Sequence, residues 1–431
     1  MLWRKSKKSK SRIRRRLSLS LRKPAICSEP LEARLLLSIT VQNQTYTAIA
    51  GSTLNVSAAN GVLNGATGGT PPYTAHDTGA PMHGGLPTFN SDGSFSYTPG
   101  SGVLGTAADS FYFDATDNYF GTSNPGTATI DVEYAITSAL DQTKLPVDTL
   151  SASRQIIGDG GGTPAGVDDL TLDYSQLAAH PTTTIEGDFA TSLANAPMNT
   201  ETVTATLTFN GVQQPLAYYS LGGMNSSDTT IHVAMPFDAS SLATGRYAYS
   251  LSIDSPNMSA VSTISGAVNI VNDAGPAGAG WDIAGLRHLY VNSASGVAAG
   301  VLETDGAGNA FYYTQGTGNS YSSPAGDFSI LTSLSGGGWQ LVDKFGTTFN
   351  FNASGYETSE VARTGLTNTY NYSSGLLTSI SDTFGRSVTL GYTSGLLSSV
   401  TDLAGNVTTI AHSGSDLTSI TLPDPGGGAP V

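Results

Sequence analysis

Cysteine is nearly absent from this chain, and its scarcity limits the chemistry that the protein can carry. The single cysteine, Cys27, lies in a basic N-terminal segment of a sequence of 431 residues. No disulfide bond can form within one chain, and no cluster of cysteines can hold a metal ion. No apolar run approaches the roughly 18 residues of a membrane-spanning helix, so the sequence predicts no transmembrane span.

Charged residues are also scarce, at 12% of the chain, about half the usual share. Long solvent-exposed helices need Glu, Lys, Arg and Ala on their outer faces, and this sequence mostly lacks them. Glycine is abundant, with 51 residues, and Ser, Thr and Asn fill the other polar positions, which is typical of strands and turns. Hydrophobic residues make up 39%, enough for packed cores, so wholesale disorder is excluded. At roughly 150 residues per domain we predict two or three domains in an all-β chain.

The charges are segregated along the sequence. Twelve of the 19 Lys and Arg residues lie within residues 1–34, where only Glu29 and Glu32 oppose them. The remaining chain holds 7 basic and 31 acidic residues, a net charge of −24. A body this acidic repels phosphate backbones and anionic lipid, so nucleic-acid binding is disfavoured. An acidic, cysteine-free β-protein fits a bacterial exported surface protein better than a cytosolic enzyme.

The basic run in residues 4–23 is either a disordered tail or the positive region of an export signal. The segment that follows, Pro30–Ser38, resembles the Leu-Glu-Pro-Arg-x-Leu-Leu motif of large exported planctomycete proteins. The matching residues are Leu31, Glu32, Arg34, Leu36 and Leu37. Ala33 stands where the motif has Pro. The resemblance implies that residues 1–38 are an export leader and that the protein is extracellular or on the cell surface.

Residues 39–134 show short alternating strands between turn clusters, as expected of a β-sandwich. Phe111 and Phe113 share one predicted face, and Ile130 and Val132 share another. The segments Gly61–Asn64, Asp92–Pro99, Asp109–Phe111 and Ala115–Asp117 resemble bacterial cadherin-like domains, a family whose members often bind calcium.

Asp114 and Asp117 are the calcium candidates in this domain. Calcium sites need several convergent oxygen ligands, and two carboxylates make a weak site. Solvated turn carboxylates are therefore the preferred interpretation, and no cofactor is predicted, with calcium as the one alternative.

Residues 135–165 are predicted to be a linker, because they end in the glycine-rich segment 158–164. Residues 166–272 are predicted to form a second β-sandwich, similar to an immunoglobulin-like spacer. In residues 202–209 apolar side chains alternate with threonines, and residues 231–235 and 247–253 repeat this alternation. His232 falls on the polar face of its strand and is interpreted as a surface residue.

A repeat of 20 residues dominates the last third of the chain. Ser374–Asp382 recurs as Ser394–Asp402, and a decayed copy follows at 416–421. Glycines and tyrosines recur with the same period, and Asp-x-x-Gly turns extend the pattern upstream. The residues predicted to have structural roles in the repeat are Asp343, Gly346, Gly365, Tyr372, Gly375, Asp382, Gly385, Tyr392, Gly395, Asp402 and Gly405.

Each copy is predicted to be a strand, an Asp-x-x-Gly turn, a second strand and a Ser-Gly turn. Glycine supplies positive φ in such turns, and Asp accepts hydrogen bonds from downstream amides. Simple alternation would place Leu376, Thr378 and Ile380 on one face and Leu377 on the other. One hairpin cannot bury its apolar face alone, but stacked copies can.

This repeat resembles the RHS/YD-repeat family, whose units combine a Tyr-Asp-x-x-Gly pattern with a Thr-Asp-x-x-Gly turn. Ser373–Arg386 matches well, and Gly278–Leu286 resembles the segment that precedes such arrays. Tyr372 and Tyr392 are followed by Ser and Thr rather than by Asp, but the spacing and the second Asp carry the match. The resemblance implies that residues 273–431 form the start of a hollow β-shell.

The sequence offers little support for catalysis. The six histidines are scattered without metal-ligand spacing, and no Gly-x-Ser-x-Gly motif is present. A spatially assembled triad or carboxylate pair stays open.

We predict a non-enzymatic exported or cell-surface scaffold or adhesion protein, whose RHS/YD array binds glycan or protein partners. One alternative is the N-terminal part of a toxin-delivery protein, whose further repeats, shell and cargo domain lie beyond residue 431. A second alternative is a calcium-dependent adhesin.

Overall fold

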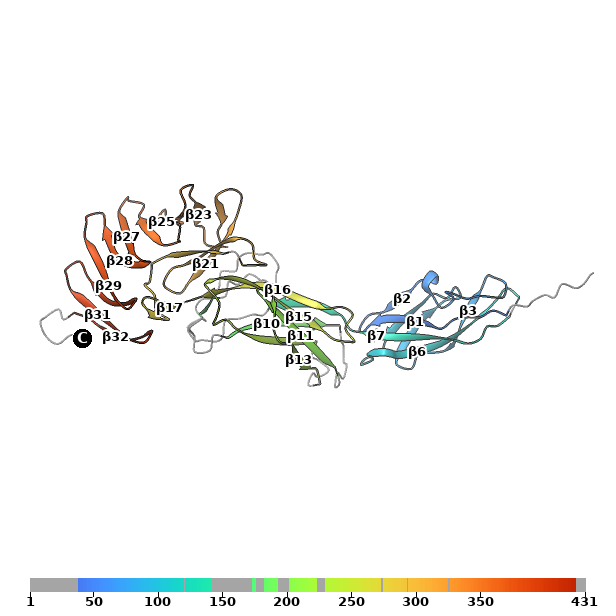
Figure 1. Cartoon of the computed structure of the whole chain (residues 1–431). Coiled ribbons are helices and arrows are strands. Elements are labelled where there is room, and N and C mark those ends of the chain that lie inside the picture. Colours follow the sequence, from blue (N-terminus) through green and yellow to red (C-terminus); the bar gives the residue numbers. More distant parts are fainter. Residues whose placement is uncertain are drawn as a thin grey trace, which may run out of the picture.

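The computed structural model describes residues 38–119, 121–141, 173–175, 182–192, 201–222, 229–272, 274–292, 294–324 and 326–423. Within these ranges the regular structure is β-strand, apart from one short 3-10 helix, η1 (Ala58–Asn60). The prediction of an all-β fold is confirmed. Two β-sandwiches follow one another and lead into a large curved sheet (Figure 1). Among the described residues no helix is long and apolar enough to cross a membrane. The export-motif residues 31–37 lie outside the described ranges.

The first sandwich contains a four-stranded and a three-stranded sheet. The larger sheet has the order β1-β7-β6-β3, and the smaller has the order β2-β5-β4. Its strands are β1 (Gln44–Ile49), β2 (Leu54–Val56), β3 (Thr74–Gly79), β4 (Gly84–Phe89), β5 (Phe95–Pro99), β6 (Gly105–Thr116) and β7 (Gly126–Glu133). Phe111, Phe113, Ile130 and Val132 are fully buried, as the predicted faces require. The Phe95 and Phe111 rings pack edge to face at 5.0 Å between the two sheets.

The second sandwich also contains two sheets. One has the order β14-β10-β8; the other has the order β12-β11-β15-β16-β9, with β13 paired to β11. The strands are β8 (Ile136–Asp141), β9 (Asp173–Ser175), β10 (Thr182–Thr191), β11 (Thr202–Phe209), β12 (Val212–Gln213), β13 (Ala217–Ser220), β14 (Thr230–Asp238), β15 (Gly245–Asp254) and β16 (Ser262–Val271). The predicted alternation in β11, β14 and β15 is confirmed, because the apolar side chains of each strand are buried. His232 is exposed on the opposite face.

The predicted linker at 135–165 begins too early. Residues 136–141 form β8, which pairs antiparallel with β10 over Gly187–Thr191. These residues belong to the second sandwich, and the two sandwiches meet at residues 134–135. Tyr134 N–H donates to Asn257 O at 2.9 Å, and Ser259 N–H donates to Tyr134 O at 2.8 Å. Backbone hydrogen bonds therefore join the first sandwich directly to the second.

A 14-stranded antiparallel meander follows a two-stranded ribbon, β17 (Ala274–Gly275) and β18 (Gly278–Ala279). Each strand from β19 to β32 pairs with the next strand in sequence. The first eight are β19 (His288–Asn292), β20 (Gly300–Thr304), β21 (Ala310–Gln315), β22 (Ser320–Ser322), β23 (Ile330–Ser333), β24 (Trp339–Val342), β25 (Thr348–Phe351) and β26 (Glu357–Val361). The last six are β27 (Thr367–Ser373), β28 (Leu376–Asp382), β29 (Ser387–Thr393), β30 (Leu396–Thr401), β31 (Val407–Ser413) and β32 (Asp416–Thr421).

The first eight strands of this meander wrap around a core of their own. Leu289 N–H donates to Gly355 O at 2.9 Å, and His288 bridges to Tyr356, so β19 meets the turn that precedes β26. The enclosed core contains Leu289, Val301, Tyr313, Leu331, Trp339, Leu341, Phe349 and Phe351. The six strands that follow extend the sheet as an open curved array. We call the side of the sheet that carries this core the inner face.

Candidate functional site

The Asp-x-x-Gly turns of the array are closed by their own Asp and Gly residues. Asp382 Oδ1 accepts hydrogen bonds from the amides of Phe384 and Arg386, both at 2.9 Å. Asp402 and Asp343 accept two amides each in the equivalent way. Gly346, Gly365, Gly385 and Gly405 have φ between +80° and +87°, a region that L-residues avoid. Ala362 stands in the Asp position of the turn that contains Gly365, and only the backbone hydrogen bonds close it.

The opposite edge of the array carries the Ser-Gly turns. Ser374 and Gly375 both have positive φ, as do Ser394 and Gly395. Two successive positive φ values give a type I′ turn, whose twist matches that of an antiparallel hairpin. Tight turns of this kind hold consecutive strands in register, so the side chains of each repeat reach equivalent places.

Each repeat also contains a β-bulge, which overturns the predicted faces. Tyr372 pairs with Leu377, whereas Asn371 pairs with Ser379, so Thr378 is an extra residue in β28. The bulge brings Leu377 and Ile380 to the same face as Tyr370 and Tyr372. Simple alternation had placed Leu377 opposite Ile380, and it failed because it assumes an unbroken ladder. Equivalent bulges occur in the hairpins β25–β26, β29–β30 and β31–β32.

A hydroxyl group at the bulge satisfies the backbone carbonyl across from it. Thr378 Oγ1 donates to Asn371 O at 3.0 Å, and Ser398 Oγ donates to Gly391 O at 3.2 Å. Thr358 and Thr418 make the same contact in their own hairpins. These four hydroxyl residues recur with the period of 20 residues, a signal of the bulge that is present in the sequence.

The periodic aromatic residues join one repeat to the previous one. The Tyr392 hydroxyl donates to Leu377 O at 2.8 Å, and His412 Nε2 makes the equivalent bond to Leu397 O at 2.8 Å. The ring centroids of Tyr372 and Tyr356 are 5.1 Å apart, and those of Tyr356 and His288 are 4.5 Å apart. A row of rings therefore runs along the Ser-Gly edge of the inner face. Burial raises the pKa of both Tyr372 and Tyr392.

A row of apolar side chains crosses the inner face of the open array. Its members are Tyr370, Ile380, Leu390, Val400, Ile410 and Ile420. The first five are half-buried, and Ile420 on the last described strand is exposed, at 49%. The row is thus less covered than the closed core under β19–β26.

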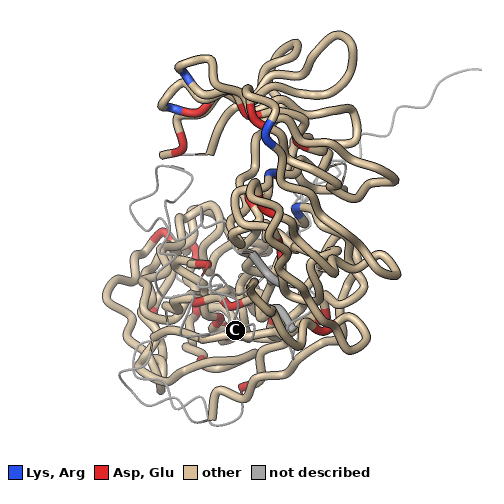
Figure 2. The backbone as a smooth tube through the Cα atoms, turned by 90° about the vertical axis from the view of Figure 1, so that its left-hand side faces the viewer, with Lys and Arg blue, Asp and Glu red and all other residues tan. Residues whose placement is uncertain are grey.

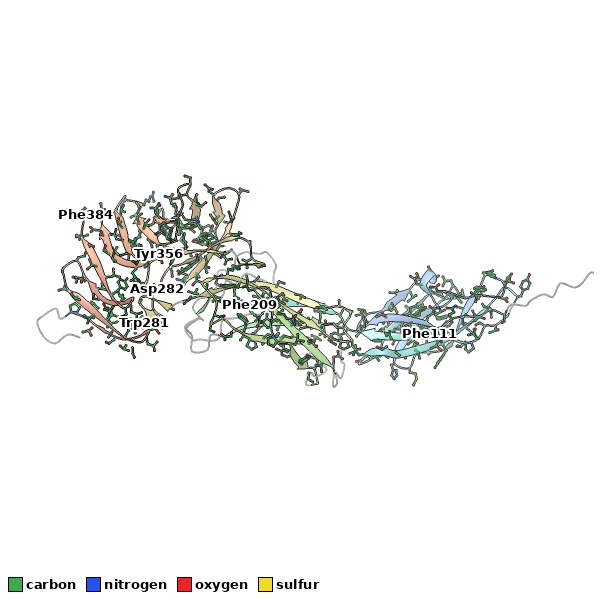
Figure 3. The ribbon with its side chains drawn as sticks, in the orientation of Figure 1. Phe111, Phe209, Trp281, Asp282, Tyr356 and Phe384 are labelled. Carbon is green, nitrogen blue, oxygen red and sulfur yellow. The ribbon has the colours of Figure 1, made fainter. Side chains whose placement is uncertain are left out.

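Residues 274–287, which we call the strap, lie on this inner face. Leu397 N–H donates to Pro276 O at 2.7 Å, and Ala279 N–H donates to Ser415 O at 2.8 Å. Figure 3 shows Trp281 and Asp282 on the concave side of the array, the same side as Tyr356, whereas Phe384 is on its outer edge. Trp281 is 52% exposed. The strap thus connects the second sandwich to strands that are more than a hundred residues further along the chain.

A cavity of about 350 Å³ lies between the strap and the array. Its lining is Ile283, Ala284, Gly285, Leu286, Arg287, Phe349, Glu360, Tyr370 and Ile380. The Tyr370 hydroxyl donates to Glu360 Oε2 at 3.4 Å, and Asn368 Nδ2 donates to the same oxygen at 3.3 Å. Its walls therefore combine apolar side chains with one cation and one anion.

Arg287 holds together the polar groups behind this cavity. Its guanidinium pairs with Glu303, which is fully buried, and lies 4.2 Å from the centre of the Phe349 ring. The Tyr313 hydroxyl is within hydrogen-bonding distance of Glu303 and Asp327, at 2.9 and 2.7 Å. Burial raises the pKa of Glu303, although the nearby Arg287 opposes that rise.

Glu357 is a second fully buried carboxyl in this cluster. Its Oε2 accepts the Arg287 backbone N–H at 2.9 Å, while its Oε1 has no hydrogen-bond partner. Burial raises the pKa of Glu357 to about 7, against an ordinary value of 4.5. The contact ties the strap to β26 at the seam where the first eight strands close.

Sequence reasoning missed Arg287, Glu303 and Glu357 as a unit. They are single charged residues separated by 16 and 70 positions from Arg287, and closure of the sheet brings them together. The available signal was that Arg287 is one of only seven basic residues after residue 34.

The calcium candidates lie apart from the array. Asp117 accepts amides from Thr70, Tyr119 and Gly121 at 2.8–3.0 Å. Hydrogen bonds from the Thr70 and Gly121 amides lower the pKa of Asp117. Asp114 lies in β6, opposite His76. The Asp117 oxygens thus already serve as acceptors in a turn. Within the described residues, no group of three or more His, Cys, Asp or Glu is arranged to hold a metal ion.

No family model matches the chain, and no curated protein matches it. Several solved structures are similar to parts of this chain at low identity and low TM-score. Drosophila OTK extracellular domains 3–5 are 11% identical, with a TM-score of 0.24 over 55% of this chain and 61% of that one. The fibronectin(III)-like modules of Clostridium thermocellum CbhA are 11% identical, with a TM-score of 0.20 over 54% of this chain and 94% of theirs.

An endo-fucoidan hydrolase of glycoside hydrolase family 107 is 13% identical, with a TM-score of 0.17 over 58% of this chain. This chain spans 31% of the length of that hydrolase.

Proposed function

We propose that the chain is a non-enzymatic exported or cell-surface scaffold, in which two β-sandwiches present an RHS/YD-repeat array to glycan or protein partners. The observation that carries this proposal is the open part of the array. Its inner face is a continuous row of half-buried apolar side chains, extended by every repeat. This row stays partly exposed beside the strap, and Ile420 is 49% exposed. Apolar surface that is left accessible in this way marks interaction sites in soluble proteins.

The joints between the three parts support a role in display. The first and second sandwiches share backbone hydrogen bonds at Tyr134, and Ala135 N–H donates to Ser192 Oγ at 3.0 Å. The second sandwich holds the array through Arg246, whose N–H donates to Asn292 Oδ1 at 3.0 Å and whose guanidinium lies 5.1 Å from the centre of the Tyr312 ring. Hydrogen-bonded joints restrict bending, so the sandwiches act as a spacer for the array.

The repeat geometry supports membership of the RHS/YD family. The unit of 20 residues contains one Asp-capped turn, one type I′ turn, one bulge and one aromatic residue bonded to the previous repeat. Each further unit of this kind can add two strands to the same sheet while keeping the same contacts within the unit. Growth of one sheet by repeated units is what the resemblance to the family implies.

The charges on the inner face favour binding over catalysis. Arg287, Glu303 and Tyr313 are bonded to one another inside the closed core. Glu360, in the cavity wall, accepts hydrogen bonds from Asn368 and Tyr370. A general acid or base must reach a substrate, and groups that are already bonded and buried are poorly placed for it.

The proposal is tested with the purified full chain fixed to beads. We expect the beads to adhere to surfaces coated with at least one class of a panel of polysaccharides and extracellular proteins. We also expect no release of reducing ends or peptides from the same panel on prolonged incubation. Adhesion equal to that of beads coated with an inert protein, or turnover of a polymer, would contradict the proposal.

A further inference from the structure

The exposed positive charges of the described residues are gathered on one edge of the array. Five Lys or Arg residues lie in the described ranges, and Arg246 and Arg287 are half-buried. The other three, Lys344, Arg363 and Arg386, are exposed and lie in the turns β24–β25, β26–β27 and β28–β29. Figure 2 shows few basic segments among the described residues, whereas the acidic ones are spread widely.

Large apolar side chains accompany these charges. Phe345 is 70% exposed, Leu366 is 51% exposed and Phe384 is 73% exposed. Lys344 Nζ lies 5.2 Å from the centre of the Phe345 ring, and Arg386 Cζ lies 5.8 Å from that of Phe384. Two of the three turns thus present a ring with a cation beside it. We call these six residues the rim.

Contacts between neighbouring turns make the rim continuous. The Arg363 side chain lies over the neighbouring turn, close enough that a Cβ on Gly346 would be 3.6 Å from its Cδ. Thr383 Oγ1 contacts both the N–H and the carbonyl of Thr367, at 2.6 and 3.1 Å. Turns on one edge of a meander are two strands apart, or about 10 Å. The rim therefore repeats one chemical unit at a regular spacing.

The acidic residues of these turns are engaged by the turns themselves. Asp343 and Asp382 each use Oδ1 to accept two backbone amides, and both are half-buried. Asp382 Oδ2 also accepts the Arg386 Nε–H at 2.6 Å, which orients that guanidinium. Lys344 and Arg363 keep their charge on the outside, so the rim presents cations to a partner although the chain as a whole is acidic.

We infer that the rim binds a linear acidic polysaccharide, one whose sugar rings carry carboxylate or sulfate groups. A sugar ring presents an apolar face that can lie on Phe345 or Phe384, while its acidic group meets the neighbouring cation. A polymer of repeating sugar units can also contact several of the repeated turns of the rim at once. The inference rests on the proposed function, in which the array is the part that binds, and it assigns a partner to the turn edge of the array, beside the inner face.

The curvature of the array separates this partner from an anionic membrane. The outer turns of β27–β31 lie along an arc, and Phe384 is at its outer edge (Figures 1 and 3). A flexible polymer can follow an arc, whereas a flat bilayer touches only part of it. The acidic body also repels anionic lipid over a wide area, and a thin polymer contacts the rim alone.

The test compares binding of the full chain to dextran sulfate and to uncharged dextran of equal length. We expect binding to dextran sulfate alone, weakened by high salt. The variant Lys344→Ser/Arg363→Ser/Arg386→Ser is expected to lose about tenfold or more in affinity, because charge-assisted contacts are lost. Lys344→Ser/Arg363→Ser leaves the Asp382 ion pair in place and is expected to lose part of that affinity. Phe345→Ser/Phe384→Ser removes the rings and is also expected to weaken binding.

Two matched controls separate the rim from general effects. Gln213→Glu/Ser241→Glu/Ala260→Glu shifts the net charge by the same amount but on the second sandwich, and Tyr218→Ser removes an exposed ring there. Both are expected to bind like the original chain. Equal loss in the charge control, unchanged binding in both cation variants, or binding to phosphatidylserine vesicles in place of dextran sulfate would overturn the inference. Bead adhesion to another polymer would leave the proposed function standing while the rim inference fails.

Discussion

Replacement of Glu357 by Gln should remove one source of pH dependence from the free energy of unfolding of the array. Glu357 is fully buried, and burial raises its pKa from 4.5 to about 7. The folded array therefore holds this proton more tightly than the unfolded chain does. The contribution of Glu357 to the stability of the array is therefore fully present below pH 4.5, and it is lost as the pH rises through about 7.

The size of the effect follows from the two pKa values. Each tenfold change in proton affinity is worth about 1.4 kcal/mol, so the ionised carboxylate costs roughly 3 kcal/mol at pH 8. Glutamine has nearly the shape of the protonated acid, and its side chain carries no charge at any pH. We expect Glu357→Gln to match the original chain near pH 4.5 and to be more stable by roughly 3 kcal/mol at pH 8.

Tryptophan fluorescence isolates this signal from the rest of the chain. The three tryptophans are at positions 3, 281 and 339, and Trp339 is buried in the closed core of the array. In a Trp3→Phe background, urea unfolding followed by fluorescence reports on the array. If the stability difference between the two chains is the same at pH 4.5 and pH 8, or if Glu357→Gln is the less stable at pH 8, the reasoning is refuted.

Two further substitutions probe contacts that hold the array together. Arg287→Met leaves Glu303 buried without its ion-pair partner, so we expect the free energy of unfolding to fall by about 3–5 kcal/mol in the same fluorescence assay. Adding Glu303→Gln should restore part of this stability, and strictly additive losses would argue against a direct pair. Tyr392→Phe removes the hydrogen bond to Leu377 O, which should lower the free energy of unfolding by about 1–3 kcal/mol. Tyr218→Phe on the second sandwich should leave it unchanged. An equal effect of the two Tyr→Phe substitutions would mean that the bond between repeats does not stabilise the array.

Much of the architecture could be predicted from local patterns. In β11 the alternation of apolar residues with threonines is unbroken, and one face is fully buried. The period of 20 residues located the turns, since Asp and Gly are required there by backbone geometry.

The faces of the repeat could not be predicted in this way. The bulge at Thr378 shifts the alternation by one residue, and only the strand register reveals it. The linker prediction included residues 136–141 because the stretch 135–165 ends in the glycine-rich segment 158–164. Pairing with β10 makes them a strand, which is tertiary context that a local pattern does not contain.

The polar cluster depends on closure of the sheet. Arg287 meets Glu303 in a neighbouring strand and Glu357 across the seam. The sequence around each of these residues does not indicate that it contacts the other two. The rim was missed for a similar reason, because its basic and aromatic residues become neighbours only when alternate turns line up on one edge.

The most direct test of the central claim is the location and orientation of the array on cells that produce the protein. Antibodies raised against the turns at 343–347 and 382–386 are applied to intact cells and to permeabilised cells. An exported scaffold that displays its array predicts strong labelling of intact cells, which external protease removes. Labelling that appears only after permeabilisation would contradict the account.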